Sequence, residues 1–216
     1  MPSSDRRARQ REQVRDRILS AARGLFARHG FEAVTLRKIA AEIDYVPGAI
    51  YVHFRDKEEL IRTLCLADFD SVTKTVAPMA KIADPIERMR RMGRAYVSFA
   101  LEHPNSYRLL FMQASPYDHD ARALERRGDP RRDGYAFLKL AAQQAIEQGR
   151  MRREFADAEL VAETFWAAVH GVASIEINFS GDAWVAWRPI RRRTEAMLDA
   201  LLAGMCVAPA KKGRGK

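Results

Sequence analysis

The sequence has little cysteine, no long apolar run and no convincing β-strand pattern. Its 216 residues include two cysteines, Cys65 and Cys206, which lie far apart. This usage predicts neither a disulfide framework nor a zinc site and is typical of a reducing cytoplasm, where we expect the protein to act. No segment approaches the roughly 18 apolar residues of a membrane span. Residues 1–17 also lack the apolar core of a signal peptide, so we expect no membrane partner.

The motifs of common enzyme classes are missing as well. The sequence contains no glycine-rich phosphate loop, no G-x-S-x-G elbow and no metal-ligand spacing. Neither cysteine has an evident catalytic partner. We therefore expect no enzyme activity, no bound metal and no cofactor. Scattered His and Asp residues would have to assemble in space to form an active site, and no pattern indicates that they do.

Positive charge gathers at the two ends of the chain. The net charge is +9, with a pI near 9.9. Residues 1–28 hold eight arginines against three acids, and residues 211–216 hold four basic residues and no acid. Basic ends are typical of nucleic-acid binders but also of solvated, disordered tails. We expect DNA contact for the N-terminal segment and a solvated tail at the C-terminus.

Residues 35–60 begin with two predicted short helices joined by a tight turn. Thr35 is a good N-cap, because its hydroxyl can accept a hydrogen bond from an unpaired backbone N–H. Apolar residues then recur at helical spacing at Leu36, Ile39, Ala40 and Ile43. Asp44 tolerates a left-handed backbone and is expected to end the first helix. Pro47 suits the first position of the second helix.

Two helices with this spacing form a helix-turn-helix, whose second helix can lie in the DNA major groove. Small Ala40 would let the two helices cross closely. The space between them would be filled by Ile39, Ile43, Tyr45 and Ile50. Asp56 and Glu59 form a capping-box pattern that opens the next helix. An ordinary αα-hairpin inside an all-α core would show similar periodicity, so periodicity alone leaves both readings open.

The fixed spacings of this stretch resemble the DNA-binding domain of the TetR family of transcriptional regulators. In that family a Thr opens the second helix, Ile-Ala follows, and a Gly-x-x-Tyr-x-His-Phe-x-x-Lys-x-x-Leu run closes the unit. The matching positions are Thr35, Ile39, Ala40, Gly48, Tyr51, His53, Phe54, Lys57 and Leu60. The resemblance covers about residues 15–62. It departs at Asp44, where the family usually has Gly, and at Val46, where it usually has Ser or Thr.

The resemblance implies a role for each matching position on double-stranded DNA with a palindromic operator. The expected phosphate contacts are Thr35, Tyr51, His53 and Lys57. Arg37 is expected to pair with guanine. The remaining expected DNA-binding residues are Lys38, Val46, Pro47, Gly48 and Ala49. Since the helix that begins at Pro47 is unusually apolar, we expect base recognition to depend on Arg37, on thymine methyl groups and on DNA shape.

The rest of the chain also predicts helices, so the fold class is all-α with about nine helices. Beyond the helix-turn-helix, the expected helices span about 9–29, 57–76, 85–103, a segment from 104, 134–148, 158–178 and 187–207, with a polar loop at 115–133. We expect a three-helix DNA-binding domain at 9–56 and a helical ligand-binding and dimerisation domain at 57–207. Basic, disordered tails are expected at 1–8 and 208–216.

Two further segments resemble TetR ligand domains: the HPNSYRLLF run at 103–111 and the Trp-x-x-x-His-Gly element at 166–171. Apolar and aromatic side chains that would line a pocket are Tyr96, Phe99, Tyr107, Leu110, Phe111, Phe137, Leu140, Phe165, Trp166 and His170. Each of them would look the same in a packed core, and His170 would look the same as a hydrogen-bonded core histidine. A hydrophobic or aromatic small-molecule effector is the expected ligand.

In the family, the last two long helices of each subunit form a four-helix bundle at a two-fold axis. The residues expected at such an interface are Ala167, Gly171, Met197, Leu198 and Leu201. Packing within one subunit is the alternative for these side chains. Dimerisation also follows from DNA binding, since one helix-turn-helix reads only a few base pairs and pairs of half-sites supply affinity.

These features together predict a dimeric, sequence-specific repressor that an effector releases from its operator. The release would follow if the effector binds better to the shape that does not fit DNA. The sequence does not decide between repression and activation. A DNA-binding regulator without a small-molecule ligand, controlled by a protein partner or by its own concentration, remains the alternative.

Overall fold

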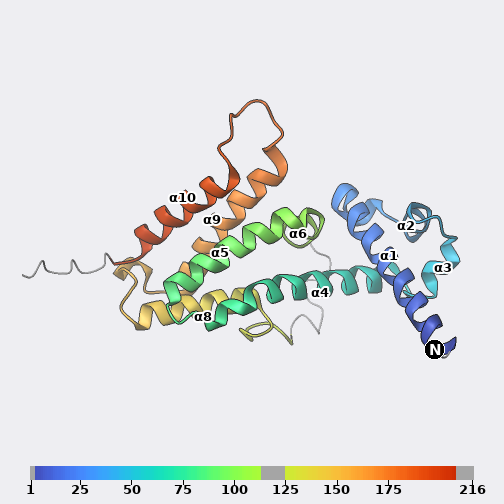
Figure 1. Ribbon diagram of the computed structural model, residues 1–216, viewed down its shortest axis with the longest axis horizontal. Helices are drawn as coiled ribbons and strands as arrows, with labels where there is room; N and C mark the ends of the chain where they lie inside the picture. The colour runs from blue at the N-terminus through green and yellow to red at the C-terminus, as the bar shows by residue number, and fades with distance from the viewer. Residues whose placement is uncertain (1–2, 113–124, 208–216) are drawn as a thin grey trace, which may run out of the picture. The chain divides into compact units, whose positions relative to one another are not determined.

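The structure is a computed structural model that describes residues 3–112 and 125–207 (Figure 1). These residues form nine α-helices and no named strand, which confirms the all-α prediction. The helices are α1 Ser3–Ala33, α2 Leu36–Glu42, α3 Pro47–Tyr51, α4 Lys57–Val76, α5 Pro85–Glu102, α6 Pro104–Phe111, α8 Gly134–Glu147, α9 Ala158–Phe179 and α10 Ile190–Met205. Two short 3-10 helices span Ala77–Lys81 and Arg153–Phe155. The expected C-terminal tail and most of the expected loop at 115–133 lie outside the described residues.

α1 begins at Ser3, earlier than the expected start near residue 9. Residues 5–13 contain neither Gly nor Pro and are rich in Arg, Gln and Glu, which favour helix. The segment expected to be disordered is therefore helical from Ser3. Near its other end, Gly30 has φ 77° and ψ 164° and interrupts the helix, as expected for a glycine that ends a helical run.

The chain divides into two compact units, which are described separately. The first comprises Met1–Ser71 and His103–Glu125, and the second comprises Val72–Glu102 and Arg126–Lys216. α4 runs from the first unit into the second, so its own backbone connects the helix-turn-helix to the second unit. α6 follows α5 directly and returns the chain to the first unit.

The core of the first unit gathers the apolar stripes of its helices. Fully buried side chains include Ile18, Phe26, Ile39, Ala40, Ile50, Leu60 and Leu64. Phe31, Val34 and Leu36 join the same core beneath α1, as their spacing predicts. The largest members are aliphatic or aromatic and come from α1, α2, α3 and α4. Each such side chain contributes roughly 1.5–3 kcal/mol to stability on burial. A shared core therefore holds α1, α2, α3 and α4 together.

A buried ion pair joins α1 to α4 inside the first unit. Arg23 donates from Nε to Asp68 Oδ1 and Oδ2 at 3.1 and 3.0 Å, and from Nη2 to Oδ1 at 2.6 Å. The Asp68 side chain is 5% exposed and that of Arg23 is 26% exposed. The fork geometry of the guanidinium matches the carboxylate at two points, so the pair fixes the position of α4 on α1.

The second unit is a bundle in which α5 and α9 each contact α8 and α10 (Figure 1). The closest approach lies at Gly93 of α5. A Cβ atom there would lie 2.8 Å from Leu198 Cδ2, 3.0 Å from Phe165 Cζ and 3.2 Å from Val169 Cγ1. Glycine is thus required for α5 to pack against α9 and α10 at this distance.

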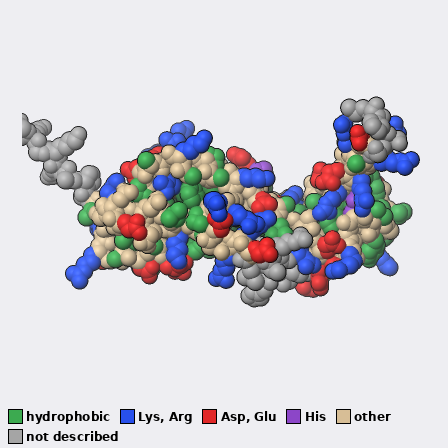
Figure 2. Space-filling view, turned by 90° about the horizontal axis from the view of Figure 1, so that it is seen from below, with side chains coloured by type: hydrophobic (Ala, Val, Ile, Leu, Met, Phe, Trp, Pro, Cys, Tyr) green, Lys and Arg blue, Asp and Glu red, His purple; other side chains and the backbone are tan. Residues whose placement is uncertain are grey.

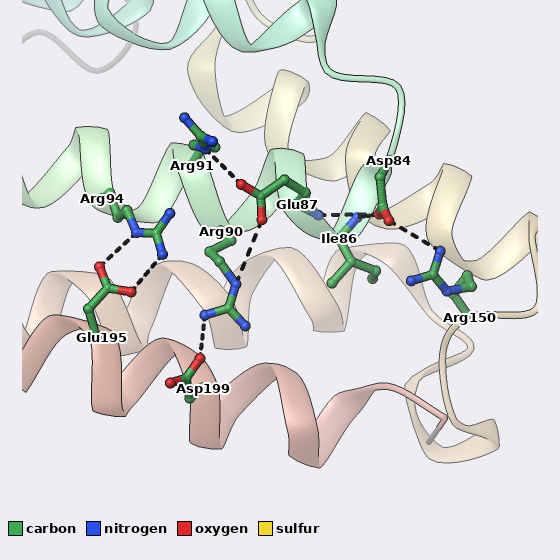
Figure 3. A network of polar contacts seen from close by, with 9 residues as sticks. All are labelled: Asp84, Ile86, Glu87, Arg90, Arg91, Arg94, Arg150, Glu195 and Asp199. Atoms are coloured by element: carbon green, nitrogen blue, oxygen red, sulfur yellow. Dashed lines mark hydrogen bonds and ion pairs between the residues drawn. The ribbon is translucent and has the colours of Figure 1, made fainter. Parts of the chain in front are cut away.

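Ion pairs also join α5 to α10 on the surface of the second unit (Figure 3). Arg94 donates from Nε and Nη2 to the two carboxylate oxygens of Glu195 at 2.7 Å each, and Arg90 pairs with Asp199. The hydrogen bond from Arg94 holds the pKa of Glu195 below its usual range. Single exposed pairs contribute little, but two pairs one helical turn apart define the register of α10 along α5.

Candidate functional site

The turn of the helix-turn-helix forms as its residue types predict. Thr35 caps α2, its hydroxyl accepting a hydrogen bond from Lys38 N at 3.3 Å. Asp44 has φ 59°, the left-handed conformation that ends α2. Tyr45 N then donates to Ala40 O at 2.9 Å and closes the turn. Asp therefore takes the place of the glycine that is usual at this position.

Val46 is the N-cap residue of α3, and its side chain makes no capping hydrogen bond. We expect Val46→Ser to raise the free energy of unfolding by about 1 kcal/mol, because a serine hydroxyl would satisfy an unpaired N–H of the first turn. In a chain of this size that gain corresponds to a melting temperature about 2–4 °C higher. Thermal unfolding measures it, with Val46→Ala as control. An equal gain in the alanine variant would show that capping is not its cause.

The side chains of α3 divide sharply between core and surface. Ile50 is fully buried and anchors the helix to the core of the first unit, as expected. The side chains around it point outward, with Val46 73%, Tyr51 59% and Val52 63% exposed. Pro47 and Gly48 are exposed and Ala49 is half-buried. α3 thus presents an outer face that the fold itself does not use.

The expected contacts on α2 and at the start of α4 are also accessible. Thr35, Arg37 and Lys38 are exposed in the first turn of α2. Lys38 Nζ donates to Ala33 O at 2.7 Å, which directs that side chain toward the loop before α2. Lys57 is half-buried at the start of α4, next to the Asp56 cap, whose carboxylate accepts from Glu59 N at 2.7 Å. The structure therefore places all ten expected DNA-binding residues in the first unit.

The sequence did not predict that two arginines of α1 lie next to the helix-turn-helix. Arg11 Nη2 donates to Val52 O at 3.2 Å, and the guanidinium of Arg15 lies 4.6 Å from the ring centroid of Phe54. Burial, followed by the charges of Arg11 and Arg15, lowers the pKa of His53, while Glu12 opposes them. The i, i+4 spacing of the two arginines was the available signal.

Basic side chains accompany this part of the first unit. Figure 2 shows several Lys and Arg side chains at the N-terminal end of α1. Over the rest of that view, acidic and basic side chains are interspersed. The positive charge predicted for residues 1–28 therefore lies on an ordered helix beside the helix-turn-helix, where it would attract a polyanion.

In the second unit, three of the expected pocket residues form one hydrogen-bonded cluster. Tyr96 of α5 lies with its hydroxyl 3.2 Å from His170 Nδ1, and Trp166 Nε1 donates to the same hydroxyl at 3.3 Å. The Trp166 and His170 rings are 6.3 Å apart. The Tyr96 hydroxyl is therefore hydrogen-bonded to both side chains at once. Burial lowers the pKa of His170, which favours the neutral form of the ring.

Tyr135 of α8 adjoins this cluster and was not predicted from sequence. Its ring lies 5.9 Å from that of Trp166, and its hydroxyl donates to Glu159 at 2.5 Å. Burial, with a further contribution from Glu159, raises the pKa of Tyr135 well above its ordinary value. The cluster therefore combines three aromatic rings with a histidine, on three helices of one unit.

The other expected pocket residues do not join the cluster. Phe99, Phe137 and Phe165 are buried in the core of the second unit, and Leu140 is 37% exposed. Tyr107, Leu110 and Phe111 belong to α6 of the first unit, where Tyr107 is fully buried and its ring lies 5.5 Å from that of Phe111. The sequence could not separate these cases, because core and pocket walls have the same residue types.

The expected dimer residues differ in accessibility. Ala167 is exposed, and Gly171, Met197 and Leu201 are partly exposed. Leu198 requires a correction, since its side chain is fully buried and packs at Gly93 within the chain itself. It belongs to the inward stripe of α10 and is not available to a partner subunit.

α9 carries an outward apolar stripe beside these residues. Large exposed members are Leu160, Ile175 and Phe179. Among the described residues, α9 is also the one helix with the length and apolar composition to cross a membrane. Core helices of soluble proteins meet those two criteria as well. The exposed stripe is apolar enough to mark a protein contact.

Comparison with known families matches both parts of the chain. Residues 18–64 match the family described as bacterial regulatory proteins, tetR family. Residues 89–204, more than half of the chain, match the family described as tetracyclin repressor-like, C-terminal domain.

Individual relatives agree with these matches. The transcriptional repressor KstR2 of Mycobacterium tuberculosis is 29% identical over 171 residues, which cover 76% of this chain and 84% of that protein. The transcriptional regulator UidR of Escherichia coli is 32% identical over 91 residues, and the chain spans only 41% of its length.

Solved structures share the fold. The ketosteroid transcriptional regulator KstR2 of Mycobacterium tuberculosis superposes with a TM-score of 0.69 at 22% identity, over 90% of this chain and 96% of that one. The structure of apo AibR superposes with a TM-score of 0.68 at 24% identity, over 85% of this chain and 95% of that one. At these identities the likeness concerns the fold alone.

Proposed function

Because the chain belongs to the TetR family of bacterial regulatory proteins, we propose that it is a DNA-binding transcriptional regulator. It acts in the cytoplasm as a dimeric repressor, and a small hydrophobic or aromatic effector releases it from a palindromic operator. The observation that carries the DNA-binding proposal is the division of α3, in which Ile50 is buried while the face formed by Val46–Val52 remains exposed. A helix anchored at one point and open elsewhere suits insertion into a major groove.

Gly48 supports this assignment. A Cβ atom at Gly48 would meet no atom within 4 Å, and its backbone has ordinary negative φ. Neither packing nor backbone conformation requires glycine there, so the fold leaves room for another surface to approach.

We expect Gly48→Leu to weaken binding to a specific duplex about tenfold while leaving the protein at least as stable as the parent, since leucine favours helix more than glycine and the new side chain clashes only with DNA. Gly204→Leu is the matched control, because its Cβ also faces open space but lies on α10 of the second unit. If both variants bind DNA as the parent does, Gly48 does not lie at the DNA surface.

The cluster of Tyr96, Trp166 and His170 supports an apolar effector that carries one hydrogen-bonding group. The rings of Tyr96, Trp166 and the adjoining Tyr135 supply apolar and aromatic surface. The linked hydroxyl, indole and imidazole groups supply polar partners. The relative named as a ketosteroid regulator is consistent with an effector of this kind. Effector release then requires that the compound bind the conformation unfit for DNA more tightly than the DNA-bound one.

A panel of apolar and aromatic compounds tests the effector proposal in two steps. Compounds that raise the melting temperature are added to the protein–DNA complex, where a true effector lowers the bound fraction. Trp166→Ala is expected to abolish the thermal shift while DNA binding without compound is kept. Absence of any stabilising compound would favour the regulator that has no small-molecule ligand.

Dimerisation through α9 and α10 is supported by the exposed stripe on α9 and by the accessible positions Ala167, Gly171, Met197 and Leu201. Sedimentation at micromolar concentration is expected to give twice the chain mass of 24.5 kDa. Gly171→Glu places a charge on this face without an internal clash and is expected to shift the protein toward monomer. A monomeric parent protein would contradict the dimer.

A further inference from the structure

The outer face of α3 is almost devoid of hydrogen-bonding side chains. The helix, Pro47–Tyr51, contains no charged residue. Its most exposed side chains are Val46 at 73%, Val52 at 63% and Tyr51 at 59%. Only Tyr51 among them carries a polar group. We call the surface of Val46, Pro47, Ala49 and Val52 the α3 apolar face.

This apolar face contributes little to the fold of the first unit. Ile50 alone among the α3 side chains is buried in the core, and Val46 provides no cap to the helix. Keeping two valines largely exposed to water has no stabilising effect that the structure reveals. Exposed apolar side chains in one place, bordered by polar ones, mark a surface that meets a partner.

Cationic side chains lie along part of the border of this face, which favours an anionic partner. Arg11 donates to the backbone of Val52, the last residue of the face, and Arg15 lies over Phe54 just beyond it. Arg37 and Lys38 are exposed in the first turn of α2, and Lys57 begins α4. An apolar face with cations beside it complements a DNA groove, whose floor holds the base edges and whose rims are phosphates.

Within a major groove, one feature matches a valine side chain. The base edges present hydrogen-bond donors and acceptors, except for the C5 methyl group of thymine. Valine cannot pair with the donors and acceptors, and it would leave them unsatisfied. We infer that the α3 apolar face reads thymine C5 methyl groups in each half-site, so that thymine at the contacted positions is selected by apolar contact. This inference rests on the proposed function and specifies the class of operator.

The test uses the full-length protein and a duplex selected from random DNA. Each thymine of the selected site is replaced singly by deoxyuridine, which removes one methyl group and keeps the base pair. Binding is expected to weaken about fourfold for each contacted methyl, the affinity equivalent of one buried methyl-sized group. At the same positions, 5-methylcytosine is expected to bind about fourfold more tightly than cytosine, since it restores the methyl on a different hydrogen-bonding edge.

Valine variants then locate the contact on the protein. The deoxyuridine penalty is the factor by which deoxyuridine weakens binding relative to thymine. In Val46→Ala or Val52→Ala, this factor is expected to fall toward one at the thymines that the missing side chain contacts. Val185→Ala is the control, because Val185 is an exposed valine of the second unit, at 44%, and should leave every penalty unchanged. A penalty that persists in both α3 variants would overturn the assignment to this face.

The outcomes separate the inference from the function on which it rests. A symmetric selected site whose affinity changes less than twofold on every deoxyuridine replacement would overturn methyl reading and keep the sequence-specific regulator. If no duplex is enriched, both fail. A selected site without thymine in either half would also overturn the inference.

Discussion

Replacing Arg23 with Met is expected to lower the free energy of unfolding by about 3–5 kcal/mol, the cost of leaving a buried charge without its partner. Asp68 is 4% exposed and receives three hydrogen bonds from the Arg23 guanidinium. Water cannot solvate the abandoned carboxylate at that depth. Denaturant unfolding of the variant measures the loss.

The double variant Arg23→Met, Asp68→Leu provides the control. It replaces the pair by apolar groups of similar size, so most of the lost stability should return. Since α4 joins the two units, the single variant is also expected to bind DNA less well near its lowered melting temperature. A loss below about 1 kcal/mol in the single variant would show that the pair is solvated or absent.

Replacing Arg37 with Ala is expected to weaken binding to a selected duplex about tenfold to a hundredfold. A bidentate contact to guanine contributes about 1–3 kcal/mol of discrimination. Arg37 is exposed in the first turn of α2 and follows the Thr35 cap that fixes the start of that helix. Binding to random DNA should change less than threefold, since only one phosphate-attracting charge is lost.

Arg28→Ala is the charge-matched control for Arg37→Ala. Arg28 is exposed in the same unit and pairs with Glu42 at 3.2 Å, so its loss removes the same charge without a proposed base contact. Fluorescence anisotropy with the selected and a scrambled duplex measures both effects. An equal loss on the two duplexes would assign Arg37 to the phosphates instead of a base.

Local chemistry explains why parts of the site were predictable. The Thr35 cap, the left-handed Asp44, the missing cap at Val46 and the buried Ile50 each depend on residues within one or two turns. Their residue types constrain the backbone directly, so the sequence predicts them.

Contacts between distant segments were not predictable in the same way. The hydrogen bond from Arg11 to Val52 joins residues 41 apart in the chain, and Tyr135 meets Trp166 across two helices. Their residue types fit many other partners equally well. Both depend on how helices pack, which periodicity does not define.

The misplaced Leu198 has a different cause. Helix α10 has apolar residues on more than one face. Leu198 and Leu201 are only three residues apart and lie on neighbouring faces of the helix. Gly93 decides between the two directions by admitting Leu198 against α5. Only the packed structure shows which leucine faces inward.

Selection of bound duplexes from a random DNA pool, repeated at several salt concentrations, tests the central claim most directly. The account predicts a two-fold-symmetric site that is enriched at every salt concentration, as expected of a dimeric reader with one helix-turn-helix per half-site. Affinity should fall with salt on all DNA, while the preference for the site persists. Binding without any enriched site, lost steeply as salt rises, would show that the basic helix α1 dominates and would contradict a sequence-specific regulator.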